Sequence, residues 1–394
     1  MFTFVHQICY MEITDLQFLF EKHKEESLYH RYITNENITP LLTTFKSFAK
    51  VEIVGKSVLG DDIFSITIGH GPKKILMWSQ MHGNESTTTK AIFDLLNTCV
   101  SNEPITNGIL KACTLCIIPI LNPDGAKAYT RVNANGVDLN RDAQNRSQPE
   151  SNVLRKVFED FKPNFCYNLH GQRTIFSAGA TNNSATVSFL APAQDASCTI
   201  TPTRKIAMEI IAEMNGYLQE VIPNQVGVYD DAFNINCVGD TFQSENVPTI
   251  LFEAGHFIND YAREKTRELI YLSYFTSLAY IADNAINGNG YKAYFDIPEN
   301  KKLFYDVIIK NVRLNNEDKE TFDLAFQYEE RLDKERIVFI PILKKIGSLE
   351  KSFGHKQINA NAAVVSSVDG TALKIDSENV FVKLNNEEIA LFSK

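Results

Sequence analysis

Short apolar runs alternate with longer amphipathic segments between about residue 50 and residue 285. The short runs are rich in β-branched residues, whereas the longer segments repeat apolar residues at the spacing of a helix. This alternation predicts an α/β domain with a mixed, mainly parallel central sheet flanked by helices. The expected strands are 51–58, 63–68, 74–79, 114–120, 165–169 and 249–253, and the expected helices lie near 86–100, 150–161, 203–220 and 261–284.

The two ends of the chain have different patterns. Helical segments at about 12–24 and 37–49 precede the α/β region, so residues 1–49 are expected to pack on its flank as an N-terminal helical segment. After the turn-forming residues 287–290, strand-like runs are separated by polar turns. These runs are 305–312, 321–328, 337–343 and 379–384. We therefore expect three parts, namely residues 1–49, a central domain over 50–288, and a small β-rich accessory domain over 291–394.

The composition fits a folded protein without affinity for polyanions. Of the 394 residues, 44% are hydrophobic and 11% aromatic, which is enough for a packed core. A formal net charge of −9 gives no electrostatic reason to bind nucleic acid or an anionic membrane. No apolar run approaches the ~20 residues that span a bilayer. We expect neither nucleic acid nor a membrane as a partner.

The cysteines and the first residues point to a reducing compartment. Seven cysteines are an odd number spread thinly along the chain, unlike a disulfide framework. Cys113 and Cys116 lie three residues apart on an expected strand, so their side chains point to opposite faces and are expected to fill the core. Residues 1–10 lack the basic start and cleavage site of a signal peptide, whether Met1 or Met11 is the natural start. A cytoplasmic location is expected.

A candidate metal-binding pair follows the expected strand 74–79. His82 and Glu85 stand three residues apart, just before an expected helix, where both side chains converge across one turn. Zinc binds nitrogen and oxygen ligands at about 2.0–2.2 Å, and a catalytic site takes three from the protein. The same short pattern also occurs in surface turns with a capping carboxylate, so the pair alone leaves both interpretations open.

Two further polar residues stand at strand ends. Ligands of open α/β sheets bind beyond the carboxyl ends of the strands. His170 follows the strand 165–169 and is therefore the candidate third ligand. Glu253 ends the strand 249–253, and a carboxylate in such a place needs a partner or a task, for example as general base toward a metal-activated water. His256 is expected to be a neighbour of the site rather than a ligand.

Two long segments without regular periodicity, 121–148 and 171–201, are expected to be functional loops. The first contains the turn Asn122-Pro123-Asp124-Gly125 and then Arg131, Asn140 and Arg141. Guanidinium groups bind planar carboxylates with paired hydrogen bonds, so this loop is a candidate anion site. The alternative is an ordinary solvated charged loop.

Taken in order, these segments resemble the carboxypeptidase A-like zinc metallocarboxypeptidases. The matching motifs are His82-x-x-Glu85, Asn122-Pro123-Asp124-Gly125, Gly136-Val137-Asp138-Leu139-Asn140-Arg141, the strand-end His170, and Phe252-Glu253. The resemblance covers roughly residues 50–285 and implies a zinc carboxypeptidase-like catalytic domain. It further implies that His82, Glu85 and His170 hold one Zn²⁺ per chain and that Glu253 is the general base.

The resemblance also implies roles for other residues. Arg131 would polarise the scissile carbonyl, Asn140 and Arg141 would bind the terminal carboxylate of the substrate, and Asp138 would orient the first zinc histidine. Tyr229 is the candidate for the tyrosine that covers the substrate, although it could equally be an ordinary loop aromatic.

Three positions depart from the better-known relatives. Asn84 stands where the pancreatic enzymes carry an arginine, which removes a cationic contact to the substrate. After His170 the chain continues Gly171-Gln172-Arg173 rather than with the usual Ser-Tyr, and Arg173 is a candidate for a new contact to an anionic group. Asp240 lies where the family builds its specificity pocket, which suggests selection of a basic or amine-bearing side chain.

The sequence thus predicts a zinc metallocarboxypeptidase that hydrolyses the C-terminal peptide bond by general-base-assisted attack of zinc-bound water. An alternative is a zinc amidase or deacylase acting on N-acyl amino acids or cell-wall peptides. A silent peptide-binding protein is disfavoured, because a binder needs no general base. The expected partner is a peptide or a small acyl-amino-acid substrate, with the oligomeric state left open.

Overall fold

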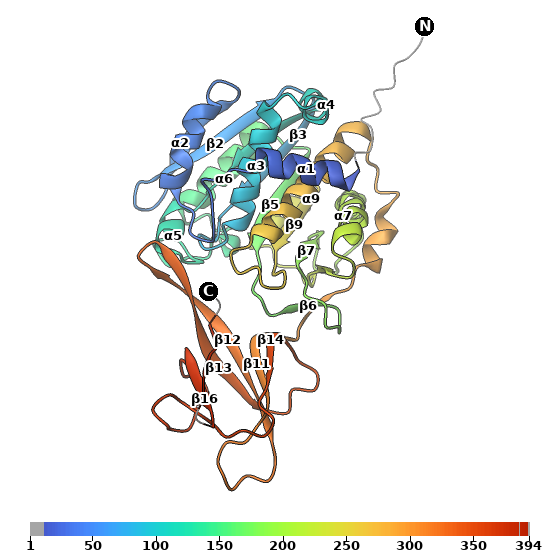
Figure 1. Ribbon diagram of the computed structural model, residues 1–394. Helices are drawn as coiled ribbons and strands as arrows, with labels where there is room; N and C mark the ends of the chain where they lie inside the picture. Colours follow the sequence, from blue (N-terminus) through green and yellow to red (C-terminus); the bar gives the residue numbers. More distant parts are fainter. Residues whose placement is uncertain (1–11, 386, 393–394) are drawn as a thin grey trace.

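The computed structural model describes residues 12–385 and 387–392 and is built around an eight-stranded sheet (Figure 1). The strand order is β1-β2-β4-β3-β5-β9-β7-β8, with parallel pairing along β4-β3-β5-β9 and antiparallel pairing at β1 and β2. The strands are β1 (Lys50–Lys56), β2 (Asp62–Gly69), β3 (Lys73–Ser79), β4 (Cys113–Ile118), β5 (Phe165–Gly171), β7 (Val187–Leu190), β8 (Val226–Val228) and β9 (Thr249–Ala254). The predicted mixed α/β fold is confirmed.

Helices cover both faces of this sheet. Side chains of β3 alternate between them, with Ile75 and Met77 in one core and Leu76 and Trp78 in the other. On the first face lie α1 (Ile13–His23), α2 (Asn35–Phe45), α3 (Thr87–Val100), α4 (Pro104–Ala112), α7 (Pro202–Val221) and α9 (Glu264–Asp283). The second face is covered by α6 (Pro149–Phe161) and α8 (Val238–Ser244). The short helix α5 (Pro123–Ala128) lies in the loop after β4.

The cysteine prediction can be checked on these two cores. Cys113 belongs to the first core and Cys116 to the second, so they do point to opposite faces of the sheet. All six described cysteines are free. Cys9 and the two candidate starts, Met1 and Met11, lie outside the described residues, and the cytoplasmic location stays a prediction.

The segment 171–201, expected to be a functional loop because it lacks regular periodicity, also contains short strands. This segment contains β6 (Phe176–Ala178) and β7, and β7 joins the central sheet between β8 and β9. Strands of three or four residues are too short to show a periodic pattern. The other long loop, 121–148, contains only α5 and a 3₁₀ turn, Leu139–Arg141.

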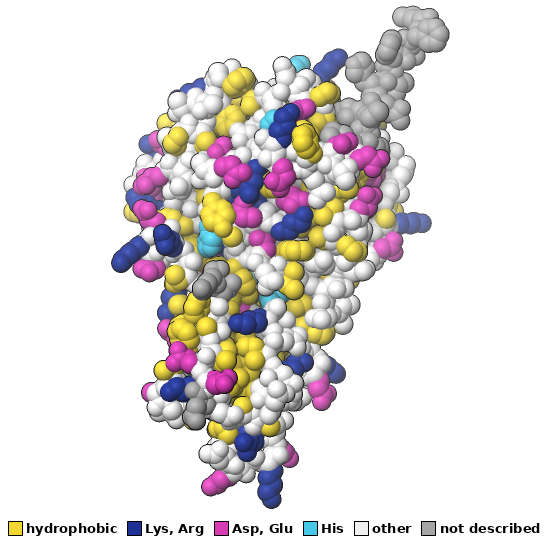
Figure 2. Space-filling model, in the orientation of Figure 1, with side chains coloured by type: hydrophobic (Ala, Val, Ile, Leu, Met, Phe, Trp, Pro, Cys, Tyr) yellow, Lys and Arg dark blue, Asp and Glu magenta, His cyan; other side chains and the backbone are white. Residues whose placement is uncertain are grey.

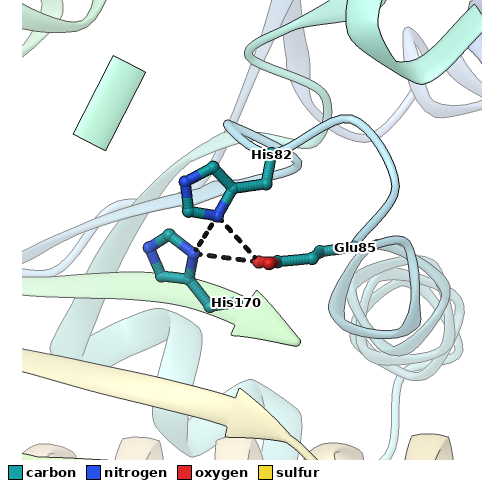
Figure 3. Close-up of side chains that lie close together, drawn as sticks. All are labelled: His82, Glu85 and His170. Carbon is teal, nitrogen blue, oxygen red and sulfur yellow. Dashed lines mark hydrogen bonds and ion pairs between the residues drawn. The ribbon is translucent and has the colours of Figure 1, made fainter. Parts of the chain in front are cut away.

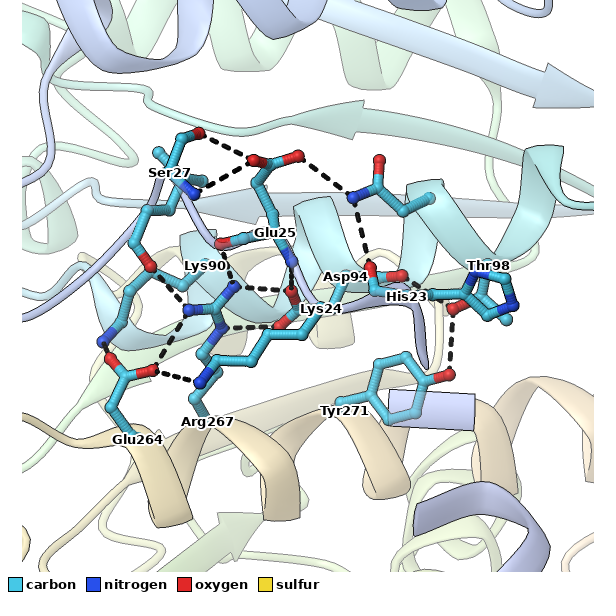
Figure 4. Close-up of polar contacts among 12 residues, drawn as sticks. His23, Lys24, Glu25, Ser27, Lys90, Asp94, Thr98, Glu264, Arg267 and Tyr271 are labelled. Atoms are coloured by element: carbon cyan, nitrogen blue, oxygen red, sulfur yellow. Dashed lines mark hydrogen bonds and ion pairs between the residues drawn. The ribbon is translucent and has the colours of Figure 1, made fainter. Parts of the chain in front are cut away.

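A buried ion pair connects the N-terminal segment to the helices (Figure 4). Arg267 of α9 contacts Asp94 of α3 through Nε and Nη2, both at 2.6 Å, and neither side chain is exposed to solvent. Arg267 also donates to the main-chain carbonyls of Glu25 and Leu28, which follow α1. One guanidinium therefore holds α3, α9 and the N-terminal segment together.

We expect Asp94→Ala to lower the free energy of unfolding by about 3–5 kcal/mol, because it removes the two-point carboxylate partner of the buried Arg267 and leaves only the longer contact to Glu264. Urea denaturation measures the change. The control is Asp160→Ala, which removes a carboxylate from the exposed ion pair of Lys156 and Asp160 in α6 and is expected to cost less than about 1 kcal/mol. Similar losses for the two variants would contradict the assigned role of Asp94.

The C-terminal part consists of two small sheets. The first has the order β13-β12-β11-β14 and the second the order β15-β16-β17. Their strands are β11 (Phe304–Val312), β12 (Phe322–Asp333), β13 (Arg336–Gly347), β14 (Phe353–Asn359), β15 (Val365–Ser366), β16 (Phe381–Leu384) and β17 (Glu387–Ala390). Before them, a 3₁₀ segment (Tyr291–Asp296) leads to β10 (Asn300–Lys302), which pairs with β6. The β-rich character is confirmed, while the division into three domains stays a prediction.

The first C-terminal sheet, β13-β12-β11-β14, is fixed against the α/β part by buried polar contacts. Glu330 of β12 accepts hydrogen bonds from Arg31 at 2.8 Å and from the hydroxyl of Tyr129 at 2.5 Å. Tyr261 donates to Asp306 of β11 at 2.8 Å. The hairpin of β12 and β13 accordingly extends to α5 (Figure 1). This sheet therefore lies beside the loops that follow the central strands.

The surface carries mixed charge on the face shown in Figure 2, where acidic and basic side chains are interspersed over both parts of the chain. No helix among the described residues is long and apolar enough to cross a membrane.

Candidate metal centre

Three potential metal ligands converge at the carboxyl ends of two adjacent parallel strands (Figure 3). His82 and Glu85 lie in the loop between β3 and α3, and His170 lies on β5. The Nδ1 atoms of the two histidines are 3.0 Å apart, and they lie 3.1 Å and 3.0 Å from Oε2 of Glu85. Because β3 pairs with β5, the sheet itself brings the sequence-distant His170 to the His82–Glu85 loop.

The chemistry of these three atoms fits a zinc ion. Oε2 of Glu85 and both Nδ1 atoms carry lone pairs, and ligands bound at about 2.0–2.2 Å to one ion lie about 3–3.5 Å from each other. Two imidazoles and a carboxylate are a donor set that zinc accepts readily, leaving a fourth position for water or substrate. Both histidines are buried, with 2% of each side chain exposed.

Asp138 fixes the orientation of the first histidine. Its Oδ1 lies 3.0 Å from Nε2 of His82. Donation from this Nε2–H leaves the lone pair of Nδ1 directed at the cluster, the arrangement in which a carboxylate orients a metal-binding histidine. Burial disfavours the ionised form of Asp138, but the hydrogen bond from His82 outweighs it and holds the pKa of this carboxyl well below its usual range.

Glu85 is likewise held as an anion. Burial opposes its ionisation, but a positively charged His82 and the contacts with both imidazole rings, in which a ring proton stands where a metal ion would bind, hold the pKa of Glu85 well below its usual range. The cluster therefore presents a permanently charged carboxylate to a cation.

Glu253 lies next to this cluster, and the pKa of its carboxyl group is shifted in the opposite direction to that of Glu85. On β9 it is the register partner of His170 on β5. Burial raises the pKa of Glu253 well above its usual range, and the negative charge of Glu85 adds to the effect. Its Oε2 is buried and accepts no hydrogen bond from the described residues. A buried carboxyl oxygen without a partner is rare and is available to water or substrate.

The structure places Arg131 at the edge of the cluster. Its Nε donates to Oδ2 of Asp138 at 3.0 Å, and its Nη1 lies 3.5 Å from Oε1 of Glu85. Almost half of the side chain is exposed, so it retains N–H groups for a ligand.

Asn140 and Arg141 lie together at the start of α8. Oδ1 of Asn140 accepts from the backbone N–H of Val238, while Arg141 donates to the carbonyl of Asn140 and to Sγ of Cys237. Arg141 forms no salt bridge with a carboxylate of the described residues. Its charge is therefore available to an anion, as the predicted role requires.

Tyr229 and Asp240 are the remaining predicted residues. The Tyr229 ring packs edge-on against Phe176, and burial together with the charges of Glu253 and Glu85 raises its pKa far above the usual range. Burial also raises the pKa of Asp240 to about 6, with Arg141 among the groups that oppose the rise. Both residues thus lie within electrostatic reach of the site, and their roles stay predictions.

Arg263 was not predicted from the sequence as a residue of the site. This side chain is 1% exposed and donates to the carbonyls of Ala254 and Gln172, the residues that follow Glu253 and Gly171. It therefore links the ends of β9 and β5 behind the metal ligands. No local motif marks it, because its partners are main-chain atoms.

Comparisons with known proteins agree with this geometry. The family described as zinc carboxypeptidase matches residues 35–232, half of the chain. Carboxypeptidase SOL1 of Arabidopsis thaliana is 29% identical over 163 residues, which are 36% of this chain and 33% of that protein. Gamma-D-glutamyl-L-diamino acid endopeptidase 1 of Lysinibacillus sphaericus is 34% identical over 92 residues, or 21% and 23% of the two chains. The chain thus matches a third or less of the length of these relatives.

A solved structure extends the likeness to the fold. Carboxypeptidase A of Helicoverpa armigera superimposes with a TM-score of 0.52 at 16% identity, covering 69% of this chain and 80% of that one. At this identity the likeness concerns the fold alone. Together with the match over residues 35–232 and the His82, Glu85 and His170 cluster, it leads to one conclusion: the chain belongs to the zinc carboxypeptidase (peptidase M14) family.

Proposed function

We propose that this protein is a zinc-dependent metallocarboxypeptidase that removes the C-terminal residue of peptides. The observation that carries the proposal is the pairing of two unlike acidic groups. Glu85 is an anion within the metal cluster, whereas Glu253, the register partner of His170, keeps a buried oxygen that has no partner among the described residues. Environments that push two carboxyl groups apart in pKa are typical of acid–base sites.

The residues of the chain divide the reaction between them. Zinc held by His82, Glu85 and His170 would act as a Lewis acid toward the scissile carbonyl and the attacking water. Glu253 accepts a proton from the water as its oxygen attacks the carbonyl carbon. It then returns this proton to the amine nitrogen as the C–N bond breaks. Arg131, with free N–H groups at the edge of the cluster, stabilises the negative charge that develops on the carbonyl oxygen.

Which peptide bond is cleaved depends on how the C-terminal end of the substrate is bound. Arg141 has no carboxylate partner among the described residues and is proposed to bind the terminal carboxylate together with Asn140. Tyr229 is proposed to cover the bound substrate. This anchoring would confine cleavage to the last peptide bond.

We expect the preference for a C-terminal lysine over leucine to increase as the pH rises through about 6. Burial raises the pKa of Asp240 to about 6, so its charge is present above that pH and lost below it. The ratio of kcat/KM for matched peptides, measured between pH 5 and 8, reports the change. Asp240→Asn is the matched variant and should flatten the profile. An unchanged ratio in Asp240→Asn would refute the specificity role.

A peptide library tests the main proposal. Zinc-loaded protein is incubated with peptides that carry either a free or an amidated C-terminus, and the products are identified by mass spectrometry. We expect successive loss of C-terminal residues from the free peptides only, because an amide removes the charge that Arg141 would bind. Internal cleavage, or equal trimming of both sets, would count against a carboxypeptidase.

The alternative is an amidase or deacylase acting on N-acyl amino acids or cell-wall peptides. One observation favours keeping it, namely the match to a relative described as a gamma-D-glutamyl-L-diamino acid endopeptidase. Testing N-acyl amino acids and muropeptides in the same assay distinguishes a carboxypeptidase from an amidase or deacylase. Turnover of these compounds without trimming of ordinary peptides would support the alternative.

A further inference from the structure

A cavity of about 360 Å³ lies between the ends of β5 and β9 and the first C-terminal sheet. Its size falls within the range of about 300–1,000 Å³ typical of small-molecule sites. The metal ligand Glu85 and Gly171 are part of its wall, and so are residues 327–330 of β12 and Lys344 of β13. The C-terminal sheet therefore helps to enclose a space that begins at the candidate metal centre.

The cavity wall carries more positive charge than its own carboxylates neutralise. Its cations are Arg31, Arg173, Arg263 and Lys344, and its carboxylates are Glu85, Glu329 and Glu330. All three carboxylates have partners, since Glu85 contacts the two histidines, Glu329 binds Arg331, and Glu330 binds Arg31. Among the cations, Lys344 is paired with Asp376 outside the cavity. The excess positive charge thus resides on Arg173 and Arg263.

Arg173 and Arg263 differ in accessibility. Arg173 is exposed and has no hydrogen bond or ion pair with any described residue. Arg263 is buried, and the oxygens to which it donates belong to main-chain carbonyls. Glu330 and Asp260 act on Arg263 electrostatically but accept no hydrogen bond from its guanidinium, so a further anion nearby would be favourable. Arg173 can reach such an anion directly, whereas Arg263 adds a fixed positive potential.

The buried side of the wall is also short of hydrogen-bond acceptors. Arg31 is 8% exposed, yet its Nε and Nη1 find no acceptor among the described residues, and the same holds for Nε of Arg263. Unsatisfied buried donors are costly, and a carboxylate is the group with acceptor capacity and no donor of its own. Against these three donors stands one unpaired acceptor of the wall among the described residues, Oδ1 of Asn84, so the wall suits an anion better than a cation.

The position of the cavity indicates which part of a substrate would enter it. Its wall contains neither Asn140 nor Arg141, the residues proposed to bind the terminal carboxylate. A peptide anchored there, with its scissile bond at the metal centre, would extend past Glu85 with the residues that precede this bond. The inference rests on the proposed function in this respect.

We propose that this cavity binds an acidic side chain located one or two residues before the scissile bond, with Arg173 as its direct contact. The substrate class is then peptides with glutamate or aspartate on the N-terminal side of the residue removed. Asn84 also lines the cavity but brings no charge. Arg173 supplies the cation from the loop after β5.

Paired peptides test this subsite. They share one C-terminal residue and differ only by glutamate or glutamine at each of the two preceding positions. We expect kcat/KM to favour glutamate at one of them by about tenfold, as a charge-assisted hydrogen bond provides. Arg173→Gln should bring the ratio close to one, and Arg173→Lys should retain part of it. The control is Arg336→Gln, which removes an exposed arginine of β13 that neither lines the cavity nor pairs with a carboxylate of its wall.

The possible outcomes test the proposed subsite and the proposed carboxypeptidase activity separately. Equal turnover of the glutamate and glutamine peptides would overturn the subsite and leave the carboxypeptidase function intact. If neither peptide is cleaved, the proposed function fails. The subsite is then tested by calorimetric binding of both peptides to the zinc-loaded Glu253→Gln variant. Tighter binding of the glutamate peptide that is lost with Arg173→Gln supports the subsite, and equal binding overturns it.

Discussion

Glu253→Gln is expected to lower kcat/KM for C-terminal hydrolysis by about 10²–10⁴-fold, the usual contribution of a general base. Glutamine has nearly the same shape as glutamate but cannot accept the proton of the attacking water. The change should appear mainly in kcat, because Glu253 is not among the three converging ligand atoms and the substrate contacts remain. Steady-state kinetics with a single dipeptide-like substrate, together with metal analysis, measures both effects.

The matched control for this prediction is Glu209→Gln. Glu209 is also a buried glutamate, but it lies on α7 and accepts a hydrogen bond from Tyr280 outside the site. It should leave kcat/KM within a factor of about two, since surface or remote changes seldom alter catalysis. If Glu253→Gln retained full activity with zinc bound, the assignment of the general base would be wrong.

The part of the fold that holds the metal ligands could be predicted from the sequence for a simple reason. The strand before His82 and the helix after Glu85 are long and strongly patterned, as β3 (Lys73–Ser79) and α3 (Thr87–Val100). The strand before His170 is equally clear. Once such strands are parallel neighbours, their carboxyl ends meet at one edge of the sheet, so sequence-distant ligands converge without any further information.

Short strands and long-range contacts could not be predicted in this way. β7 and β8 contain four and three residues, fewer than a periodic pattern needs. The ion pair of Arg31 and Glu330 joins residues 299 positions apart, and neither residue lies in a motif. The C-terminal sheet was recognised as β-rich, but its location beside the metal centre depends on such contacts. The cavity and the excess charge of its wall were therefore beyond the reach of the sequence, although Arg173 was already a candidate for an anionic contact.

Removing a metal ligand is expected to have the second large effect. His170→Ala should reduce bound zinc from about one ion per chain to a small fraction, because a catalytic site has only three protein ligands. Activity should fall by at least about 10³-fold, since the zinc provides both Lewis acid and water activation. Metal analysis after dialysis and kinetics on the same samples measure the two losses. The control is His70→Ala, an exposed loop histidine outside the cluster.

Thermal unfolding separates loss of the metal from loss of the fold. In the zinc-free protein, His170→Ala removes a buried ring and the contact of its Nδ1 with Glu85, so we expect a loss of about 1–3 kcal/mol but still a cooperative transition. Zinc added at 1,000 times its Kd should stabilise the wild type by about 4 kcal/mol and raise its Tm. His170→Ala should show no such shift while unfolding cooperatively. A variant that still gains stability from zinc would place the ion elsewhere than between His82, Glu85 and His170.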